Sequence, residues 1–283
     1  MNSRFPEWLK VKAPKRGAYE EMAEYLKSMG LHTVCQSASC PNIGECFSKK
    51  TATFMILGNI CTRNCGFCGV YSGGPLCVDP DEPRHVGEAS AKMGLRYVVV
   101  TSVTRDDLPD GGAGQFAETI TQIKAHIPDA KIEVLIPDLQ GDENSLRTIL
   151  EAGPFVLNHN VETVPRLYST VRPSANYRRS LGLIETVKRI STSIYTKSGI
   201  MVGLGESKEE VVEVLSDLRE VGCDIVTIGQ YLRPSKSNLT VVEYVHPSRF
   251  DEYKAIGDSM GFRYVASGPF VRSSYHAADI VDS

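Results

Sequence analysis

Three closely spaced cysteines, Cys61-x3-Cys65-x2-Cys68, follow a run of apolar and β-branched residues. This spacing supplies three thiolates, whereas a structural zinc site closes with four ligands. A cubane iron–sulfur cluster takes one ligand per iron, so three cysteines leave one iron without a protein ligand. The segment therefore predicts a 4Fe–4S cluster with one open iron, at which a small molecule can bind and react. Three ligands of a zinc site with a distant fourth are the competing interpretation.

A second set of three cysteines precedes the first, with the spacing Cys35-x4-Cys40-x5-Cys46. Proline, asparagine and glycine residues between them favour a tight loop, which can direct backbone N–H groups at the sulfurs of a cluster. We therefore expect a second cluster here. A structural zinc site is the alternative interpretation of this spacing.

Size, charge and hydropathy exclude several classes of function. The 283 residues, 42% of them apolar, suffice for one large α/β domain or two modest ones. A net charge of −3 argues against a nucleic-acid binder, and the lack of a long apolar run argues against a membrane span. Residues 1–8 lack the apolar stretch of a secretory signal, so we expect a cytoplasmic protein whose cysteines bind metal rather than form disulfides. A trimmed organelle presequence is the alternative.

Short β-branched runs alternate with amphipathic stretches from residue 53 onward. We expect strands over 53–60, 96–102, 131–136, 155–160, 194–202 and 225–230. We expect helices over 85–93, 115–126, 145–151, 178–190, 208–221 and 247–260. Such alternation predicts an α/β fold with a parallel sheet and right-handed crossovers. Eight units close a TIM barrel, so six predict a partial (β/α)6 TIM-like barrel that is open on one side.

The chain divides into three expected parts within one compact unit. Residues 1–50 form an N-terminal extension that carries Cys35, Cys40 and Cys46, and residues 51–261 form the partial barrel. Residues 262–283 form a C-terminal extension that contains the hydroxyl-rich run Arg272-Ser273-Ser274-Tyr275.

Polar residues and glycines stand where several of the expected strands end. Active sites of βα barrels lie at the carboxyl ends of the strands, so we expect these residues to contact a cofactor. Buried caps and turns are the alternative account of the same residues. The cofactor-binding candidates are Thr101, Ser102, Asn158, Asn160, Glu162, Met201 and Glu206. Arg172 and Arg233 lie at mouth positions, where an arginine can bind a carboxylate or form a surface ion pair.

The cysteine motif, with Phe67 directly before its last member, resembles that of the radical S-adenosylmethionine (SAM) superfamily. The combination of both cysteine sets with the run Arg272-Ser273-Ser274-Tyr275 is similar to the lipoyl synthase family within it. The resemblance includes the segments 101–108 and 158–163, and it extends from Cys35 to Tyr275.

The resemblance implies a radical SAM sulfurtransferase of lipoate biosynthesis. Its first cluster, on Cys61, Cys65 and Cys68, binds SAM and cleaves it reductively to a 5′-deoxyadenosyl radical. Its second, auxiliary 4Fe–4S cluster supplies the sulfur, which is inserted at C6 and C8 of an octanoyl group amide-linked to a lysine of a lipoyl-carrier protein. The implied ligands of this auxiliary cluster are Cys35, Cys40, Cys46 and Ser274, with Ser273 as the alternative serine.

The resemblance also implies partners and leaves rival classes to be separated. We expect octanoylated lipoyl-carrier domains and an electron donor such as ferredoxin or flavodoxin as partners, and neither nucleic acid nor a membrane. A ferredoxin-like electron carrier, a biotin-synthase-like sulfur inserter and a zinc-scaffolded interaction protein are the alternatives. Iron and sulfide analysis of anaerobically purified protein distinguishes the zinc protein from the others.

Overall fold

The computed structural model describes residues 6–9, 24–33 and 51–274. The cysteine set Cys35, Cys40 and Cys46 and the terminal Tyr275 lie outside these residues.

The central element is an eight-stranded sheet in the order β1-β2-β5-β6-β7-β8-β9-β10. Every neighbouring pair from β2 to β10 is parallel, and only β1 pairs antiparallel with β2. The strands are β1 (His32–Thr33), β2 (Thr51–Ile56), β5 (Tyr97–Ser102), β6 (Lys131–Leu135), β7 (Val156–Asn158), β8 (Tyr195–Val202), β9 (Ile225–Gln230) and β10 (Tyr264–Gly268). Because the strands are parallel, their carboxyl ends all lie at one end of the sheet.

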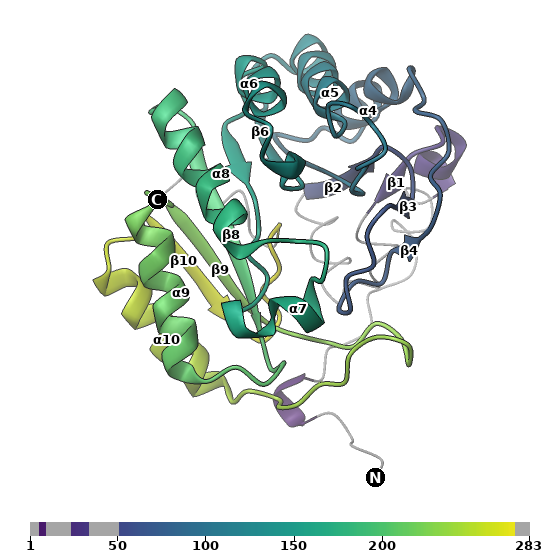
Figure 1. Cartoon of the computed structure of the whole chain (residues 1–283). Helices are drawn as coiled ribbons and strands as arrows, with labels where there is room; N and C mark the ends of the chain where they lie inside the picture. The colour runs from purple at the N-terminus through teal and green to yellow at the C-terminus, as the bar shows by residue number, and fades with distance from the viewer. Residues whose placement is uncertain (1–5, 10–23, 34–50, 275–283) are drawn as a thin grey trace.

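Helices connect these strands and cover the outer face of the curved sheet (Figure 1). They are α4 (Glu82–Lys92), α5 (Ala113–His126), α6 (Glu143–Glu151), α8 (Tyr177–Ile190), α9 (Lys208–Glu220) and α10 (Pro247–Ser259). Shorter turns are α7 (Tyr168–Val171), η1 (Glu7–Leu9), η2 (Leu139–Gly141) and η3 (Pro165–Leu167). A capping box between Ser207 and Glu210 starts α9, and the Asn176 side chain caps the start of α8.

Two apolar clusters pack the helices onto the sheet. Phe54, Phe116 and Ile132 belong to the cluster under α4, α5 and α6, and Val226 and Phe250 belong to the one under α9 and α10. Alternate residues of each strand face these clusters, which leaves the other residues to line the inside of the barrel.

Apolar residues close the amino-terminal end of the barrel. The first residues of four strands, Tyr97, Val156, Ile225 and Tyr264, are apolar or aromatic, and Phe155 packs edge-to-face on Tyr195 with ring centroids 5.3 Å apart. Water and substrate therefore reach the interior from the opposite end, at which the strands finish.

The predicted strand–helix alternation is confirmed, with shifted boundaries. All six expected strands and all six expected helices are present, and β2 starts and ends earlier than the predicted 53–60. The sequence analysis missed β10, which follows the sixth helix and adds a seventh parallel strand beside β9. No helix in the described ranges is long and apolar enough to cross a membrane.

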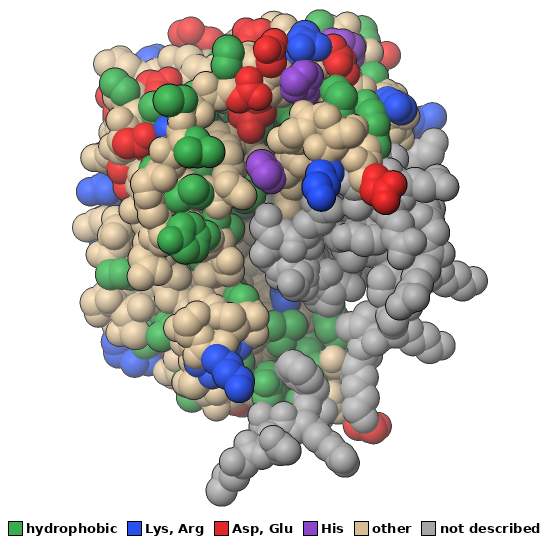
Figure 2. All heavy atoms as spheres, turned by 90° about the vertical axis from the view of Figure 1, so that its right-hand side faces the viewer, with side chains coloured by type: hydrophobic (Ala, Val, Ile, Leu, Met, Phe, Trp, Pro, Cys, Tyr) green, Lys and Arg blue, Asp and Glu red, His purple; other side chains and the backbone are tan. Residues whose placement is uncertain are grey.

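Two further short strands, β3 (Ile60–Cys61) and β4 (Tyr71–Ser72), pair in parallel beside the main sheet. Figure 2 shows the side of the molecule on which they lie; in its described part, acidic and basic side chains gather along the upper edge. On nearby α4, Arg84 contacts Asp81 and Glu88 at 3.3 and 2.7 Å. Charges of both signs therefore pair on this part of the surface.

Candidate functional site

The segment that runs from the end of β3 to β4 carries the Cys61-x3-Cys65-x2-Cys68 motif. Cys61, Cys65 and Cys68 are all half-buried. The backbone N–H of Arg63 donates to Cys61 Sγ at 3.4 Å, and that of Val70 donates to Cys68 Sγ at 3.5 Å. Such N–H groups stabilise negative charge on sulfur, as a cluster-bound thiolate requires.

The electrostatics of these thiols call for a positively charged group. Burial raises the pKa of Cys65 and raises that of Cys68 to about 11. Iron ions offset this desolvation and keep the thiolates deprotonated. Within the described ranges, no three His, Cys, Asp or Glu side chains gather closely enough to hold a single metal ion. A cubane binds each thiolate through a different iron, so three thiolates can hold it and leave one iron without a protein ligand.

Backbone contacts from distant segments hold the cysteine loop. The Gly66 N–H donates to Val171 O at 2.9 Å, and Gly66 O accepts from the Leu239 N–H at 2.9 Å. The Asn238 side-chain amide donates to Cys68 O at 2.8 Å. A Cβ at position 66 would lie 2.9 Å from the Leu239 side chain, so glycine permits this close approach.

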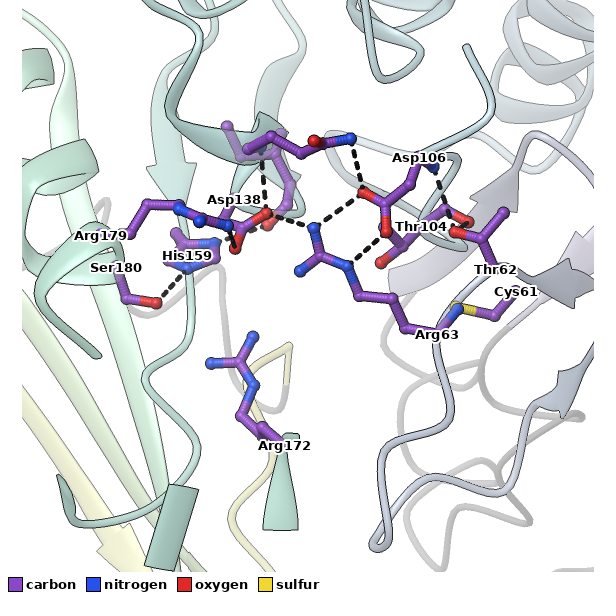
Figure 3. Close-up of polar contacts among 12 residues, drawn as sticks. Cys61, Thr62, Arg63, Thr104, Asp106, Asp138, His159, Arg172, Arg179 and Ser180 are labelled. Atoms are coloured by element: carbon purple, nitrogen blue, oxygen red, sulfur yellow. Dashed lines mark hydrogen bonds and ion pairs between the residues drawn. The ribbon is translucent and has the colours of Figure 1, made fainter. Parts of the chain in front are cut away.

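Arg63 ties the loop to the ends of two strands (Figure 3). Its guanidinium donates to both oxygens of Asp106, at 2.7 and 2.8 Å, and to Asp138 Oδ1 at 2.7 Å. Asp106 follows β5 and Asp138 follows β6, and the Arg63 and Asp138 side chains are 6% and 0% exposed. Burial alone would raise the pKa of Asp138, but the hydrogen bonds and charge of Arg63 hold it at about 2.

The segment after Asp138 has strained backbone. Leu139 and Gln140 adopt φ values of +46° and +52°, which residues other than glycine rarely take. The Asp138 carboxylate accepts from the Gln140 N–H at 3.1 Å and from Arg179 Nη1 at 3.2 Å. The same carboxylate therefore stabilises the strained turn and binds Arg63.

The polar residues at the end of β7 meet the C-terminal tail. Asn160 Nδ2 donates to Glu162 Oε1 at 3.1 Å and to Ser273 Oγ at 2.7 Å. Burial raises the pKa of Glu162, and the nearby charge of Arg172 opposes this effect. The bond to Ser273 brings the tail to the carboxyl ends of the strands, beside the half-buried Ser274.

Several buried polar atoms at this end of the barrel have no hydrogen-bond partner in the described part of the chain. They are Ser102 Oγ, Asn158 Oδ1, Asn160 Oδ1 and Arg172 Nε. Buried polar atoms are almost always satisfied, so a group of unsatisfied ones at a barrel mouth indicates a ligand. Arg172 Nη1 donates to the backbone oxygen of Asn160 at 2.8 Å, and Figure 3 shows its guanidinium directed toward the side where His159 and Arg63 lie.

The amino-acid sequence was also compared with known proteins. The chain matches the Radical SAM superfamily over residues 55–218. It is 60% identical over 277 residues to a lipoyl synthase of Caldanaerobacter subterraneus subsp. tengcongensis, covering 98% of this chain and 97% of that protein. A lipoyl synthase of Caldicellulosiruptor saccharolyticus is 57% identical over 279 residues, covering 99% and 98%. The chain belongs to the lipoyl synthase family.

Solved structures support the fold assignment of this chain. HydG, a maturase of the FeFe-hydrogenase, matches with a TM-score of 0.57 at 14% identity, over 93% of this chain and 71% of that one. Streptococcus suis SuiB matches with a TM-score of 0.58 at 10% identity, over 92% and 57%. At such low identity these similarities show the fold alone, and they confirm the predicted partial barrel.

Membership of the family confirms the predicted enzyme class. A lipoyl synthase is a radical SAM sulfurtransferase of lipoate biosynthesis and uses SAM and two 4Fe–4S clusters. The zinc, electron-carrier and biotin-synthase-like alternatives are thereby set aside.

Two of the predicted cofactor-binding residues, Thr101 and Glu206, form hydrogen bonds within the protein itself. The Thr101 hydroxyl donates to Leu135 O at 2.9 Å. The Glu206 carboxylate accepts from the Gly203 and Leu204 N–H groups at 2.5 and 2.9 Å, so it stabilises its own turn. These contacts agree with the turn interpretation, and cofactor binding by both residues stays a prediction.

Met201 packs against the buried cluster of Val171, Leu204 and Tyr231, and Phe67 of the cysteine loop packs against the same cluster. It is therefore near the predicted site, and its contact with a cofactor stays a prediction. Of the two tail serines, Ser273 is the one bound to Asn160, while Ser274 has no side-chain hydrogen bond among the described contacts.

Four buried charged residues of the site were missed by the sequence analysis. Arg63 lies between Cys61 and Cys65, so its position in the sequence already marked it as a candidate. Lys197 and Glu133 lie in strands whose other residues are mostly apolar, so each stood out as a charge in a buried segment. Asp138 carried no such signal, because acidic residues are ordinary in loops.

Proposed function

We propose that the carboxyl end of the barrel is the SAM site, with Cys61, Cys65 and Cys68 as the ligands of the cluster to which SAM binds. Unsatisfied buried atoms at this end of the barrel, among them Asn158 Oδ1, carry this proposal. SAM offers ribose hydroxyls, an amino-acid head group and an adenine, whose donors and acceptors suit these atoms.

When bound, the cluster and SAM supply a carbon radical that can take hydrogen from an unactivated C–H bond, which acid–base groups cannot do. The chain's own residues then act by placement and by exclusion of water. Arg63, Asp106 and Asp138 fix the cysteine loop relative to β5 and β6. The backbone contacts of Gly66 fix it to the end of α7 and to Leu239.

Glu162 and Arg172 are the charged groups suited to the amino-acid head of SAM. Arg172 is 9% exposed and has one guanidinium N–H without a partner in the described chain, so it can bind a carboxylate. Glu162, held by Asn160 Nδ2, can accept from an ammonium group. Binding of a zwitterion between them would neutralise both buried charges.

We propose Cys35, Cys40, Cys46 and Ser274 as the ligands that would hold the auxiliary cluster, the source of the inserted sulfur. The bond between Asn160 and Ser273 supports this assignment, because it engages the first serine and places the second next to the site. A serine oxygen is a harder ligand than a thiolate, so it would leave iron more readily when sulfur is removed. Ser273 is the fallback ligand.

The substrate is proposed to be an octanoyl group on a lysine of a lipoyl-carrier domain, with sulfur inserted at C6 and C8. Ferredoxin or flavodoxin is the proposed electron donor. The test is mass analysis of an octanoyl-lysyl peptide incubated anaerobically with the protein, a reductant and SAM. Cys61→Ala should leave the peptide unchanged, whereas Cys77→Ser, at an exposed cysteine, should behave as the natural protein does.

A further inference from the structure

One buried charged pair lies inside the barrel, beneath the site described above. Lys197 on β8 and Glu133 on β6 are 1% and 0% exposed, and Lys197 Nζ lies 2.9 and 3.0 Å from the two carboxylate oxygens. Desolvation of both charges costs about as much as their attraction returns, so apolar residues often replace such a pair without loss of stability. Stabilisation of the fold therefore does not explain why this pair is present.

The Glu133 carboxylate has two more donors, one from each neighbouring strand. The Tyr97 hydroxyl of β5 donates to Oε2 at 2.8 Å, and Asn158 Nδ2 of β7 donates to Oε1 at 2.9 Å. Four adjacent strands thus contribute one inward side chain each. A carboxylate with four donor contacts can only accept, so every partner must turn an N–H or O–H toward it.

This requirement fixes the orientation of the Asn158 amide. If the amide were flipped, its oxygen would face the Glu133 oxygen, which is repulsive. Nδ2 therefore points at Glu133 and Oδ1 faces away from it. Asn158 is fully buried, and its Oδ1 has no partner in the described part of the chain.

We propose that Glu133, with its counter-ion Lys197, is a positioning residue that makes Asn158 present an acceptor to SAM. This inference rests on the proposed SAM site and adds a preference for one kind of ligand group. At Asn158 the site binds a donor of SAM, a hydroxyl or an amino group, and cannot bind an acceptor. Neither Glu133 nor Lys197 needs to touch SAM for this effect.

The test is the dissociation constant of SAM, measured by anaerobic calorimetry on the cluster-loaded protein without reductant, so that no turnover occurs. Asn158→Ala removes the acceptor and should weaken binding roughly tenfold. The paired variant Glu133→Gln/Lys197→Met removes both charges together. The new amide at position 133 can accept or donate, so Asn158 is no longer held in one orientation, and binding should weaken about threefold to fivefold.

Two comparisons separate positioning from plain stability. Asn158→Ala should cost less affinity in the paired background than in the natural sequence, because both changes act through one amide oxygen. Thr196→Val, at the neighbouring buried position on β8, removes hydrogen bonds to Gly222 and Asp224 and should lower the melting temperature without changing SAM affinity.

Distinct results overturn the inference and the proposed function. If the natural protein and Asn158→Ala bind SAM equally well, the proposed contact fails. If Asn158→Ala binds weakly but the paired variant binds as the natural protein does, the positioning role of Glu133 fails alone. If the paired variant does not fold, Glu133→Gln alone is compared with Asn158→Ala and the natural protein in the same way.

Discussion

Arg63 and Asp138, which are 75 residues apart in the chain, form a buried ion pair with Nη2 and Oδ1 2.7 Å apart. Arg63 lies between two cluster cysteines, and Asp138 begins the strained turn after β6. The pair therefore makes the position of the cysteine loop depend on the geometry of a strand end. We therefore expect loss of the cluster to be the first effect on the site when this pair is broken.

Arg63→Ala should destabilise the protein and lower its iron content. It leaves Asp106 without the arginine it pairs with and Asp138 with the Arg179 contact at 3.2 Å, and breaking a buried pair typically costs about 3–5 kcal/mol. Arg63→Lys keeps the charge but lacks the planar guanidinium that bonds Asp106 through two N–H groups and reaches Asp138 as well, so it should give an intermediate result. Denaturant unfolding and iron analysis measure the two effects.

Arg84→Ala is the matched control for Arg63, because Arg84 makes only exposed pairs on α4. Its effect on the free energy of unfolding should be much smaller than that of Arg63→Ala, with iron content unchanged. Equal losses for the two arginine variants would contradict the role given to Arg63.

Gly66→Ala should loosen the cysteine loop, since the added Cβ would lie 2.9 Å from Leu239 and 3.2 Å from Thr170 O. Overpacking of this kind costs about 1–3 kcal/mol. We expect faster iron loss to a chelator, followed by absorbance, and partial recovery when Leu239→Ala is added. At Gly74 a Cβ would meet nothing within 4 Å, so Gly74→Ala should lose iron at the natural rate; faster loss there would refute the steric account.

His159 should make the folded protein less stable as the pH is lowered through the mildly acidic range. Burial, with the charge of Arg172, lowers its pKa to about 4, and its ring contacts Ile136 O and Ser180 Oγ, both at 2.9 Å. Unfolded histidine has a pKa of about 6.5, so between these values the unfolded state binds more protons than the folded state. The folded state therefore loses up to about 3 kcal/mol as pH falls from 6.5 to 4.

Urea unfolding across this pH range, compared with His159→Gln, tests the account of His159. The natural protein should show a steeper fall in unfolding free energy than the variant. Parallel pH profiles would show that His159 does not carry the effect.

Ser274→Ala and Ser273→Ala should differ. The first removes the proposed ligand of the auxiliary cluster, so iron content and double sulfur insertion should both fall. The second removes one hydrogen bond of Asn160, worth about 1 kcal/mol, and should spare the iron content. If only Ser273→Ala lost iron, the two serines would exchange roles.

The barrel could be predicted because its signals are local. Alternating strand and helix patterns located all six units, and the cysteine spacing predicted the cluster loop. The strand β10 was missed because Tyr264–Gly268 is short and adjoins Pro269, where a turn was the natural expectation. A parallel strand at the edge of a sheet is decided by its neighbour β9, and its own sequence carries little of that information.

The polar network could not be predicted, because its partners are distant in sequence. Glu133 contacts Lys197, 64 residues away, and Asn160 contacts Ser273, 113 residues away. The sequence analysis also could not separate a cofactor contact from a turn residue at Glu206, whose carboxylate binds the N–H groups of its own glycine-rich loop.

The most direct test of the whole account is anaerobic purification followed by one incubation with an octanoyl-lysyl peptide, reductant and SAM, read by mass spectrometry and metal analysis. We expect about eight irons and eight sulfides per chain and a peptide that has gained two sulfur atoms. A colourless protein that contains zinc as its only metal and leaves the peptide unchanged would contradict the account.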